Sequence, residues 1–193
     1  MEGALLVAGM KAGLASETET KRYPRTDLIP FESEHRFMAT FHHSHEGNAF
    51  VFVKGAPERI LQMCMLQRSL DGDVPLDKAY WLNRIEQLAA KGERVLAMAL
   101  KPMDFEKREL TFSDVESGLI MLGMYGMIDP PREEAIKAVE VCKKAGIRVK
   151  MITGDHGATA LAISRQLKLI NTDDVLRGEE IGAMSEDALK LRV

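Results

Sequence analysis

A lysine and a glycine stand where a strand is predicted to end and a helix to begin. The run Lys54-Gly55-Ala56-Pro57-Glu58 follows the apolar run 50–53, which is typical of a strand. Gly55 has no Cβ, so its backbone can approach a ligand closely, and Lys54 adds a mobile positive charge. Pro57 suits the first position of a helix, where its missing N–H is not needed. The pattern favours an anionic or phosphorylated ligand, although a plain strand–turn–helix junction with a solvated lysine would use the same residues.

A second polar motif, Thr153-Gly154-Asp155, lies between the branched apolar run 147–152 and a predicted helix. The run predicts a parallel strand, and ligands collect at the carboxyl ends of such strands. The N-terminus of the following helix favours phosphate, and the Thr153 hydroxyl can donate to a phosphoryl oxygen. Capping of the helix by Asp155 is the alternative interpretation.

A proline-rich motif, Asp129-Pro130-Pro131-Arg132-Glu133, separates the other two. Its two prolines stiffen the chain and disfavour helix before them, so we expect a hinge and a domain boundary near residue 128. The three motifs in this order resemble the cytosolic region of P-type cation-transporting ATPases, most closely the group that includes calcium, sodium–potassium and proton pumps. Each motif is weak by itself, but three in this order are specific, and the resemblance covers nearly the whole chain.

The resemblance implies a parent protein that couples ATP hydrolysis to cation transport across a membrane. It implies ATP as the ligand of this chain and Mg²⁺ as a further cofactor in the intact pump. It also implies that the chain is a piece of a longer protein, held at the cytoplasmic face of a cell membrane. Its partners would then be the rest of the same polypeptide, namely the membrane domain, the actuator domain and the remainder of the phosphorylation domain.

The same resemblance implies an ATP site in the first domain. Phe31 matches the family's adenine-stacking phenylalanine, and Arg36, five positions later, matches a basic residue that helps bind the nucleotide. Ser33 stands where the family often has an arginine, so one phosphate contact is expected to be either missing or supplied by another residue. Lys54 matches the pocket lysine, with Gly55 beside it.

Two further residues complete the implied ATP site. Arg94 resembles the arginine that bridges the nucleotide to the neighbouring domain, and Glu2 matches the last residue of a family element of which only the tail is present. Each candidate has an alternative interpretation. Phe31 would serve equally as a core residue, Arg36 and Arg94 as surface charges, and Glu2 as a carboxylate in the first turn of a helix.

The resemblance assigns Thr153, Gly154 and Asp155 to a phosphorylation pocket, with Asp129 as a hinge aspartate near it. The hinge itself is Asp129, Pro130, Pro131 and Arg132. The family's nucleophilic motif, Asp-Lys-Thr-Gly-Thr, and its later magnesium-binding motif, Gly-Asp-Gly-Val-Asn-Asp, do not occur in the sequence. Because phosphoryl transfer needs both a nucleophile and a metal, we expect this chain to bind ATP without turning it over. No metal ligands are predicted, and His43 and His45 are interpreted as an exposed hairpin end.

The elements that must position these residues fall into two groups. Residues 1–127 mix strands and helices without βα regularity, which predicts an α+β nucleotide-binding domain with an antiparallel sheet flanked by helices. Residues 128–193 alternate helix and strand, which predicts part of an α/β domain, haloacid-dehalogenase-like (Rossmann-like) by the resemblance. Helices are predicted over 4–14, 57–67, 76–91 and from 131 to about 144. A last helix is predicted to follow Asp155 and to run to about residue 168. Strands are predicted over 29–43, 48–53, 94–101, 119–127 and 147–152.

The composition is that of an ordinary soluble globular protein, with 46% hydrophobic and 28% charged residues. The net charge of −3 gives no reason to expect nucleic acid as a partner. Cys64 and Cys142 fit free thiols in a reducing compartment, and no apolar stretch approaches the roughly 18 residues of a membrane span.

Two other interpretations remain open at this stage. One is a stand-alone haloacid-dehalogenase-like phosphatase, although its Asp-x-Asp motif is not visible at a strand end. The other is a non-catalytic module that binds phosphate or a partner. Half of a parallel sheet would also expose an apolar edge, so dimerisation of the isolated chain is a further expectation.

Overall fold

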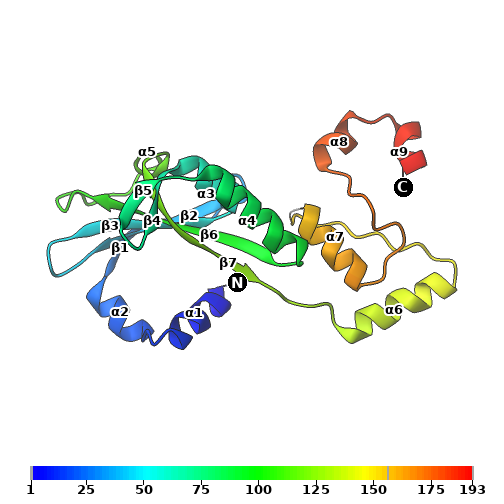
Figure 1. Ribbon diagram of the computed structural model, residues 1–193, viewed down its shortest axis with the longest axis horizontal. Helices are drawn as coiled ribbons and strands as arrows, with labels where there is room; N and C mark the ends of the chain where they lie inside the picture. Colours follow the sequence, from blue (N-terminus) through cyan, green and yellow to red (C-terminus); the bar gives the residue numbers. More distant parts are fainter. Residues whose placement is uncertain (1, 156, 193) are drawn as a thin grey trace. The chain divides into compact units, whose positions relative to one another are not determined.

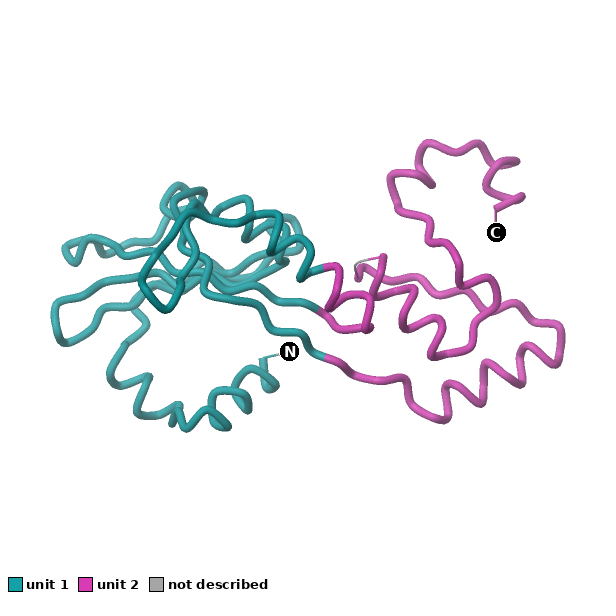
Figure 2. The backbone as a smooth tube through the Cα atoms, viewed as in Figure 1, with its two compact units in different colours: residues 1–85, 95–127 teal, residues 86–94, 128–193 magenta. Residues whose placement is uncertain are grey.

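The structure is a computed structural model that describes residues 2–155 and 157–192 (Figure 1). It divides into two compact units, coloured separately in Figure 2. Unit 1 comprises residues 1–85 and 95–127, and unit 2 comprises residues 86–94 and 128–193. The segment 86–94, at the end of one helix and the start of the next strand, therefore groups with the C-terminal part of the chain.

Unit 1 is built around a seven-stranded mixed sheet with the order β1-β2-β3-β6-β7-β4-β5. Its strands are β1 (Arg25–Ile29), β2 (Phe37–His43), β3 (Ala49–Gly55), β4 (Cys64–Ser69), β5 (Gly72–Pro75), β6 (Arg94–Met103) and β7 (Leu119–Met127). The pairs β1–β2, β2–β3, β3–β6 and β4–β5 are antiparallel, whereas β4 and β7 are parallel. The α+β class predicted for this part of the chain is confirmed, but the prediction of a purely antiparallel sheet is wrong, because β4 and β7 pair in parallel.

Helices flank the sheet of unit 1. They are α1 (Glu2–Lys11), α2 (Ser16–Arg22), α3 (Pro57–Met63), α4 (Lys78–Ala90) and α5 (Phe112–Val115). In the view of Figure 1, α3 and α5 lie above the sheet, whereas α1 and α2 lie below it. The core lies against α3, because alternate residues of β2 and β3 point to that side. Phe37, Phe41, Val51 and Val53 are buried there with Ile60 of α3.

The hairpin expected between the predicted strands 29–43 and 48–53 is confirmed, since β2 pairs with β3 from Phe37–Gly55 to His43–Ala49. The single strand predicted over 29–43 is wrong, because β1 ends at Ile29 and a loop precedes β2. The helix predicted over 57–67 is also too long. It ends at Met63, and the following residues form β4, which pairs with β7 on one side and β5 on the other. These long-range pairings override the local helical pattern.

Unit 2 contributes helices α6 (Glu133–Lys144), α7 (Gly157–Gln166), α8 (Gly178–Ala183) and α9 (Glu186–Arg192). The strand predicted over 147–152 is wrong, since the structure assigns no strand to the described residues from 128 onwards. An extended run becomes a strand only when neighbouring strands satisfy its backbone groups. Ile147 and Ile152 are exposed instead of being packed within a sheet. The parallel sheet expected for this region is therefore not formed.

None of the helices in the described part of the chain is both long and apolar enough to cross a membrane.

Candidate functional site

A cavity of about 310 Å³ opens on the sheet of unit 1. This volume falls in the size class of small-molecule sites. Its lining comes from α1 and five strands: Glu2, Arg25, Met38, Thr40, Phe52, Val53, Lys54, Met98, Ala99 and Leu122. The side chains of Met38 and Thr40 alternate with the core residues Phe37, Ala39 and Phe41. They consequently point to the sheet face opposite the core.

Strand register places Lys54 at the centre of this face. Lys54 is paired with Met38 on β2 and with Met98 on β6, and both methionines line the cavity. Two residues further along β2, Thr40 is paired with Phe52. The arrangement gives an apolar floor with a few polar groups, which is typical of sites that bind a flat, polar-edged ligand.

The ammonium of Lys54 forms an ion pair with the carboxylate of Glu2 on α1. The Lys54 side chain is only 24% exposed, whereas that of Glu2 is 76% exposed. The structure thus brings together two of the residues that the family resemblance implies for ATP binding. Because the pair lies at the cavity, it also supplies adjacent hydrogen-bond donors and acceptors to any ligand there.

The structure shows a packing reason for glycine at position 55. A Cβ at this position would lie 2.4 Å from the carbonyl oxygen of Arg36 and 2.7 Å from the Cα of Phe37. The same Arg36 carbonyl accepts a 2.9 Å hydrogen bond from the backbone N–H of Ala56. Gly55 therefore admits the protein's own backbone, which ties the loop before β2 to the end of β3, and its role beside a ligand stays a prediction.

That loop, residues 30–36, carries the two other nucleotide-binding candidates of unit 1. Phe31 is 59% exposed, so it is a surface aromatic and not a core residue. Arg36 is exposed and takes a left-handed backbone conformation, with φ of 60°. Neither residue is part of the cavity lining, and their roles in nucleotide binding stay predictions.

In unit 2, Arg94 and Asp155 form a 2.7 Å ion pair in which the Asp155 side chain is only 19% exposed. The hydroxyl of Thr153 accepts a 3.0 Å hydrogen bond from the N–H of Asp155, and Gly154 has open space beside its Cα. The hydroxyl of Thr159 donates to the carbonyl of Glu93, next to Arg94. The candidates Arg94, Thr153 and Asp155 therefore share one cluster.

The hinge candidates precede α6. Asp129, Pro130 and Arg132 are exposed, Pro131 is partly exposed, and Arg132 directly precedes the first residue of the helix. Glu133 and Glu134 occupy the first turn of α6, where they complement the helix dipole. The hinge role of these four residues stays a prediction.

Sequence reasoning missed several residues that line the cavity. Met38, Thr40 and Phe52 share a sheet face with Lys54, and residue alternation along the two predicted strands could have found them. Arg25 and Leu122 could not be found in this way, because only the strand order brings β1 and β7 to the same cavity.

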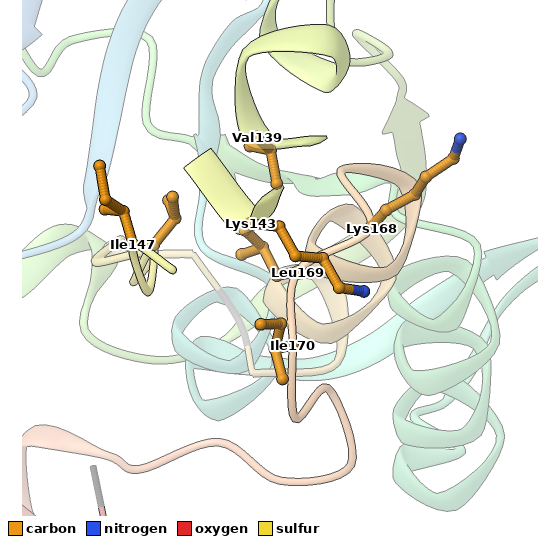
Figure 3. Close-up of a pocket in the computed structure, with 7 residues that line it drawn as sticks. Val139, Lys143, Ile147, Lys168, Leu169 and Ile170 are labelled. Atoms are coloured by element: carbon orange, nitrogen blue, oxygen red, sulfur yellow. The ribbon is translucent and has the colours of Figure 1, made fainter. Parts of the chain in front are cut away.

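Two more features were not predicted. Glu32, Glu34 and His35 carry possible metal-ligand atoms that all lie within 4.8 Å of one another. A second, much smaller cavity of about 10 Å³ lies in unit 2, between α6 and the segments around Ile147 and Leu169 (Figure 3). It is mostly apolar and holds about one water molecule at most, so it is not a ligand site.

Comparison with known proteins identifies the family. The sheet of unit 1 carries a cavity with charged residues on one face. Residues 1–134 match the family profile described as P-type ATPase, cytoplasmic domain N. The chain therefore belongs to the cation-transporting P-type ATPase family.

Similar proteins come from bacteria and yeast. The chain is 42% identical over 186 residues to the cation-transporting ATPase pma1 of Synechocystis, covering 95% of this chain and 20% of that protein. It is 40% identical over 194 residues to calcium-transporting ATPase 1 of Lactococcus lactis, covering 98% of this chain and 22% of that protein. It is 39% identical over 181 residues to the sodium/potassium exporting P-type ATPase cta3 of Schizosaccharomyces pombe, covering 87% of this chain and 17% of that protein. The chain spans about a fifth of the length of the curated relatives it matches.

Proposed function

We propose that this chain is the ATP-binding portion of a P-type ATPase that couples ATP hydrolysis to cation transport, at the cytoplasmic face of a membrane. The observation that carries the proposal is the cavity on the sheet of unit 1, with the Lys54–Glu2 ion pair at its side. Membership of the family and the match of residues 1–134 to its domain N support the same function.

The chemistry of the cavity fits a nucleotide. A purine has two flat apolar faces and a polar edge, and the floor formed by Met38, Phe52 and Met98 offers a matching apolar surface. Lys54 and Glu2 provide a donor and an acceptor for the edge or for the sugar phosphate. Phe31 is available for stacking because its ring is exposed, and Arg36 adds a charge to the same loop.

Unit 2 is proposed to be part of a haloacid-dehalogenase-like phosphorylation domain. The cluster of Arg94, Thr153 and Asp155 supports this, because it combines a cation, a hydroxyl and a carboxylate that suit a phosphoryl group. The sequence contains no Asp-Lys-Thr-Gly-Thr nucleophile. The chain on its own should therefore hold ATP without hydrolysing it.

Magnesium does not fit the residues described at the cavity. Mg²⁺ requires several oxygen ligands in octahedral geometry, whereas Glu2 is the one carboxylate among the described residues of the cavity lining and it is already paired with Lys54. In the intact pump, Mg²⁺ is expected to be held mainly by the ATP phosphates and by residues elsewhere in the protein.

Calorimetric titration of the chain with ATP tests the proposal. Saturable binding is expected for the unaltered chain, with clear weakening in Lys54→Ala and in Phe31→Ala. The exposed variant Arg68→Ala, on the β4–β5 hairpin, is the control and should bind as the unaltered chain does. Binding of inorganic phosphate with no dependence on adenine would instead favour a phosphatase or a phosphate-binding module, and turnover of ATP that persists through repurification would contradict the non-hydrolytic role.

A further inference from the structure

Thr40 is the one neutral polar side chain among the described residues that line the cavity, and the other lining residues are either apolar or charged. Thr40 is half-buried and borders the apolar floor, since it follows Met38 by two residues on β2 and is paired with Phe52 on β3. Lys54, the partner of Met38, is its diagonal neighbour, with roughly 7–8 Å between the two Cα atoms. A base that rests on this floor beside Lys54 therefore presents an edge to the Thr40 hydroxyl.

The Thr40 hydroxyl is hydrogen-bonded to a histidine on the same face of β2. Its Oγ1 lies 2.9 Å from Nε2 of His42, and the other ring nitrogen, Nδ1, lies 3.0 Å from the carbonyl oxygen of Tyr23. A carbonyl oxygen only accepts, so Nδ1 carries the hydrogen of the neutral ring and Nε2 is left as an acceptor. The Thr40 hydroxyl therefore donates its only hydrogen to His42.

The surroundings of His42 keep its ring neutral at pH 7. Burial is the main cause that lowers its pKa from 6.5, and the charges of Arg25 on β1 and His43 on β2 lower it further, whereas the hydrogen bond to the carbonyl acts in the opposite direction. On the side of β3, the ring stacks on Phe50 at 5.7 Å and meets Phe52 edge-on at 5.6 Å. Neither of these rings carries a charge, so the groups that bear on the titration from the sheet are Arg25 and His43.

We propose that Thr40 selects the nucleobase, as a hydrogen-bond acceptor that only a donor on the base can satisfy. This inference rests on the proposed ATP-binding function. Because the hydrogen of Thr40 is committed to His42, its hydroxyl oxygen meets the cavity with a free lone pair. Adenine carries an amino group, which is a donor, at position 6 of its ring, whereas guanine and hypoxanthine carry a carbonyl oxygen there. The amino group donates to Thr40, but the carbonyl oxygen meets a second acceptor, so the site favours adenine.

His42 acts through Thr40 and is a positioning residue. When the pH falls through the folded-state pKa of His42, Nε2 gains a hydrogen and donates it to the Thr40 oxygen. The hydrogen of Thr40 is then released toward the cavity, where it can donate to a carbonyl oxygen of the base. The preference for adenine should therefore weaken on acidification, and this effect requires both side chains.

Calorimetric titration of the full chain with ATP and, separately, with ITP, whose base is hypoxanthine, tests the selection. The unaltered chain should bind ATP roughly 5- to 30-fold more tightly than ITP at neutral pH, the range for one hydrogen bond gained or left unpaired. Thr40→Val keeps the shape of the side chain without the hydroxyl, so this ratio should fall close to one, whereas Thr40→Ser should retain it. Thr26→Val is the matched control and should leave the ratio unchanged, because Thr26 also bonds a histidine, with 2.8 Å to Nδ1 of His43, but lies outside the cavity lining.

A pH series with adenosine and inosine, followed by amide NMR shifts, tests the role of His42, and it also serves if Thr40→Val does not fold. Nucleosides are used because a terminal phosphate itself titrates near pH 6. The preference for adenosine should decline as the pH is lowered below 6.5. In His42→Phe, which keeps an aromatic ring against Phe50 but has no acceptor, the preference should be small at every pH. A merely structural role of His42 would change both affinities together and leave their ratio intact.

Three results would overturn the inference: equal affinities of the unaltered chain for ATP and ITP, a ratio that persists in Thr40→Val, or a preference that does not respond to pH. In those outcomes Lys54→Ala still reduces ATP binding, so the proposed function survives. No binding of ATP to the unaltered chain would refute both.

Discussion

Replacing Gly55 with alanine tests how the loop before β2 is fixed to β3. The new Cβ would lie 2.4 Å from the Arg36 carbonyl oxygen, 2.7 Å from the Phe37 Cα and 2.8 Å from the Phe37 Cβ. Two of these three atoms belong to the backbone, so the clash cannot be relieved by a change of rotamer. Either β2 must move away from β3 or the Arg36 loop must shift.

The expected cost has two parts. Overpacking of a tight site costs about 1–3 kcal/mol. Displacement of Arg36 also loses the 2.9 Å hydrogen bond from Ala56 N–H to the Arg36 carbonyl, which contributes about 1 kcal/mol. Gly55→Ala should therefore lower the free energy of unfolding by roughly 2–4 kcal/mol, a large part of the stability of a typical domain.

Urea denaturation followed by circular dichroism measures this difference. Gly123→Ala is the matched control, because Gly123 also lies in a strand of the same sheet, β7, and a Cβ added there would meet no atom within 4 Å. That substitution should be neutral or stabilising by up to about 1 kcal/mol. If Gly55→Ala were as stable as Gly123→Ala, the close approach of the Arg36 backbone would be refuted.

Three other predictions concern single charged or titratable groups. The pKa of His42 is lowered below 6.5, mainly by burial. The stability that its neutral form contributes should therefore be complete above pH 6.5 and fall as the pH drops through the folded-state pKa. In His42→Gln, the melting temperature should no longer show this dependence on pH. Asp27 has a lowered pKa because it accepts the backbone N–H groups of Leu110 and Leu28. Its contribution should therefore be present above pH 3.8 and vanish as the pH falls through the folded-state pKa, and Asp27→Ala should cost about 1–3 kcal/mol in urea denaturation by leaving the Leu110 N–H unpaired. A double-mutant cycle of Arg94→Met and Asp155→Asn should give a coupling of at most about 1 kcal/mol, because Arg94 is 55% exposed, and a coupling well above 2 kcal/mol would contradict this weak pairing.

Local patterns were sufficient for the central hairpin of unit 1. The apolar run 50–53 and the turn at Gly47 predict β3 and its connection to β2, and the structure has both. Helix α4 likewise follows from apolar spacing, and α6 follows from its proline at the start and its acidic and basic ends. In each case the deciding signal lies within about a dozen neighbouring residues.

Two segments whose structure depends on distant partners were not predicted correctly. Residues 64–69 continue the helical pattern of α3, but they form β4 because β7, some 55 residues later, pairs with them in parallel. The run 147–152 shows the opposite error, since its branched residues favour a strand but find no neighbouring strand in the described part of the chain. Propensity alone cannot distinguish these two situations.

The candidate site likewise contains residues that sequence motifs identified and one that only strand pairing could identify. Lys54 and Glu2 were predicted from sequence motifs, and the structure places them in one ion pair at the cavity. Gly55 was also predicted from a motif, and the structure adds that it admits the Arg36 backbone. Arg25 was missed because its place beside the cavity follows from the pairing of β1 with β2, including an irregular register between Arg25 and Asp27.

Methyl NMR of methionine tests most directly whether the cavity on the sheet is where ATP binds. Met38 and Met98 line the cavity on either side of Lys54, whereas Met63 is buried in the core. Addition of ATP should shift the Met38 and Met98 methyl signals in a saturable manner, leave Met63 almost unchanged, and lose its effect in Lys54→Ala. Saturable ATP binding that moves other methionines while Met38 and Met98 stay still would contradict the assignment of this cavity.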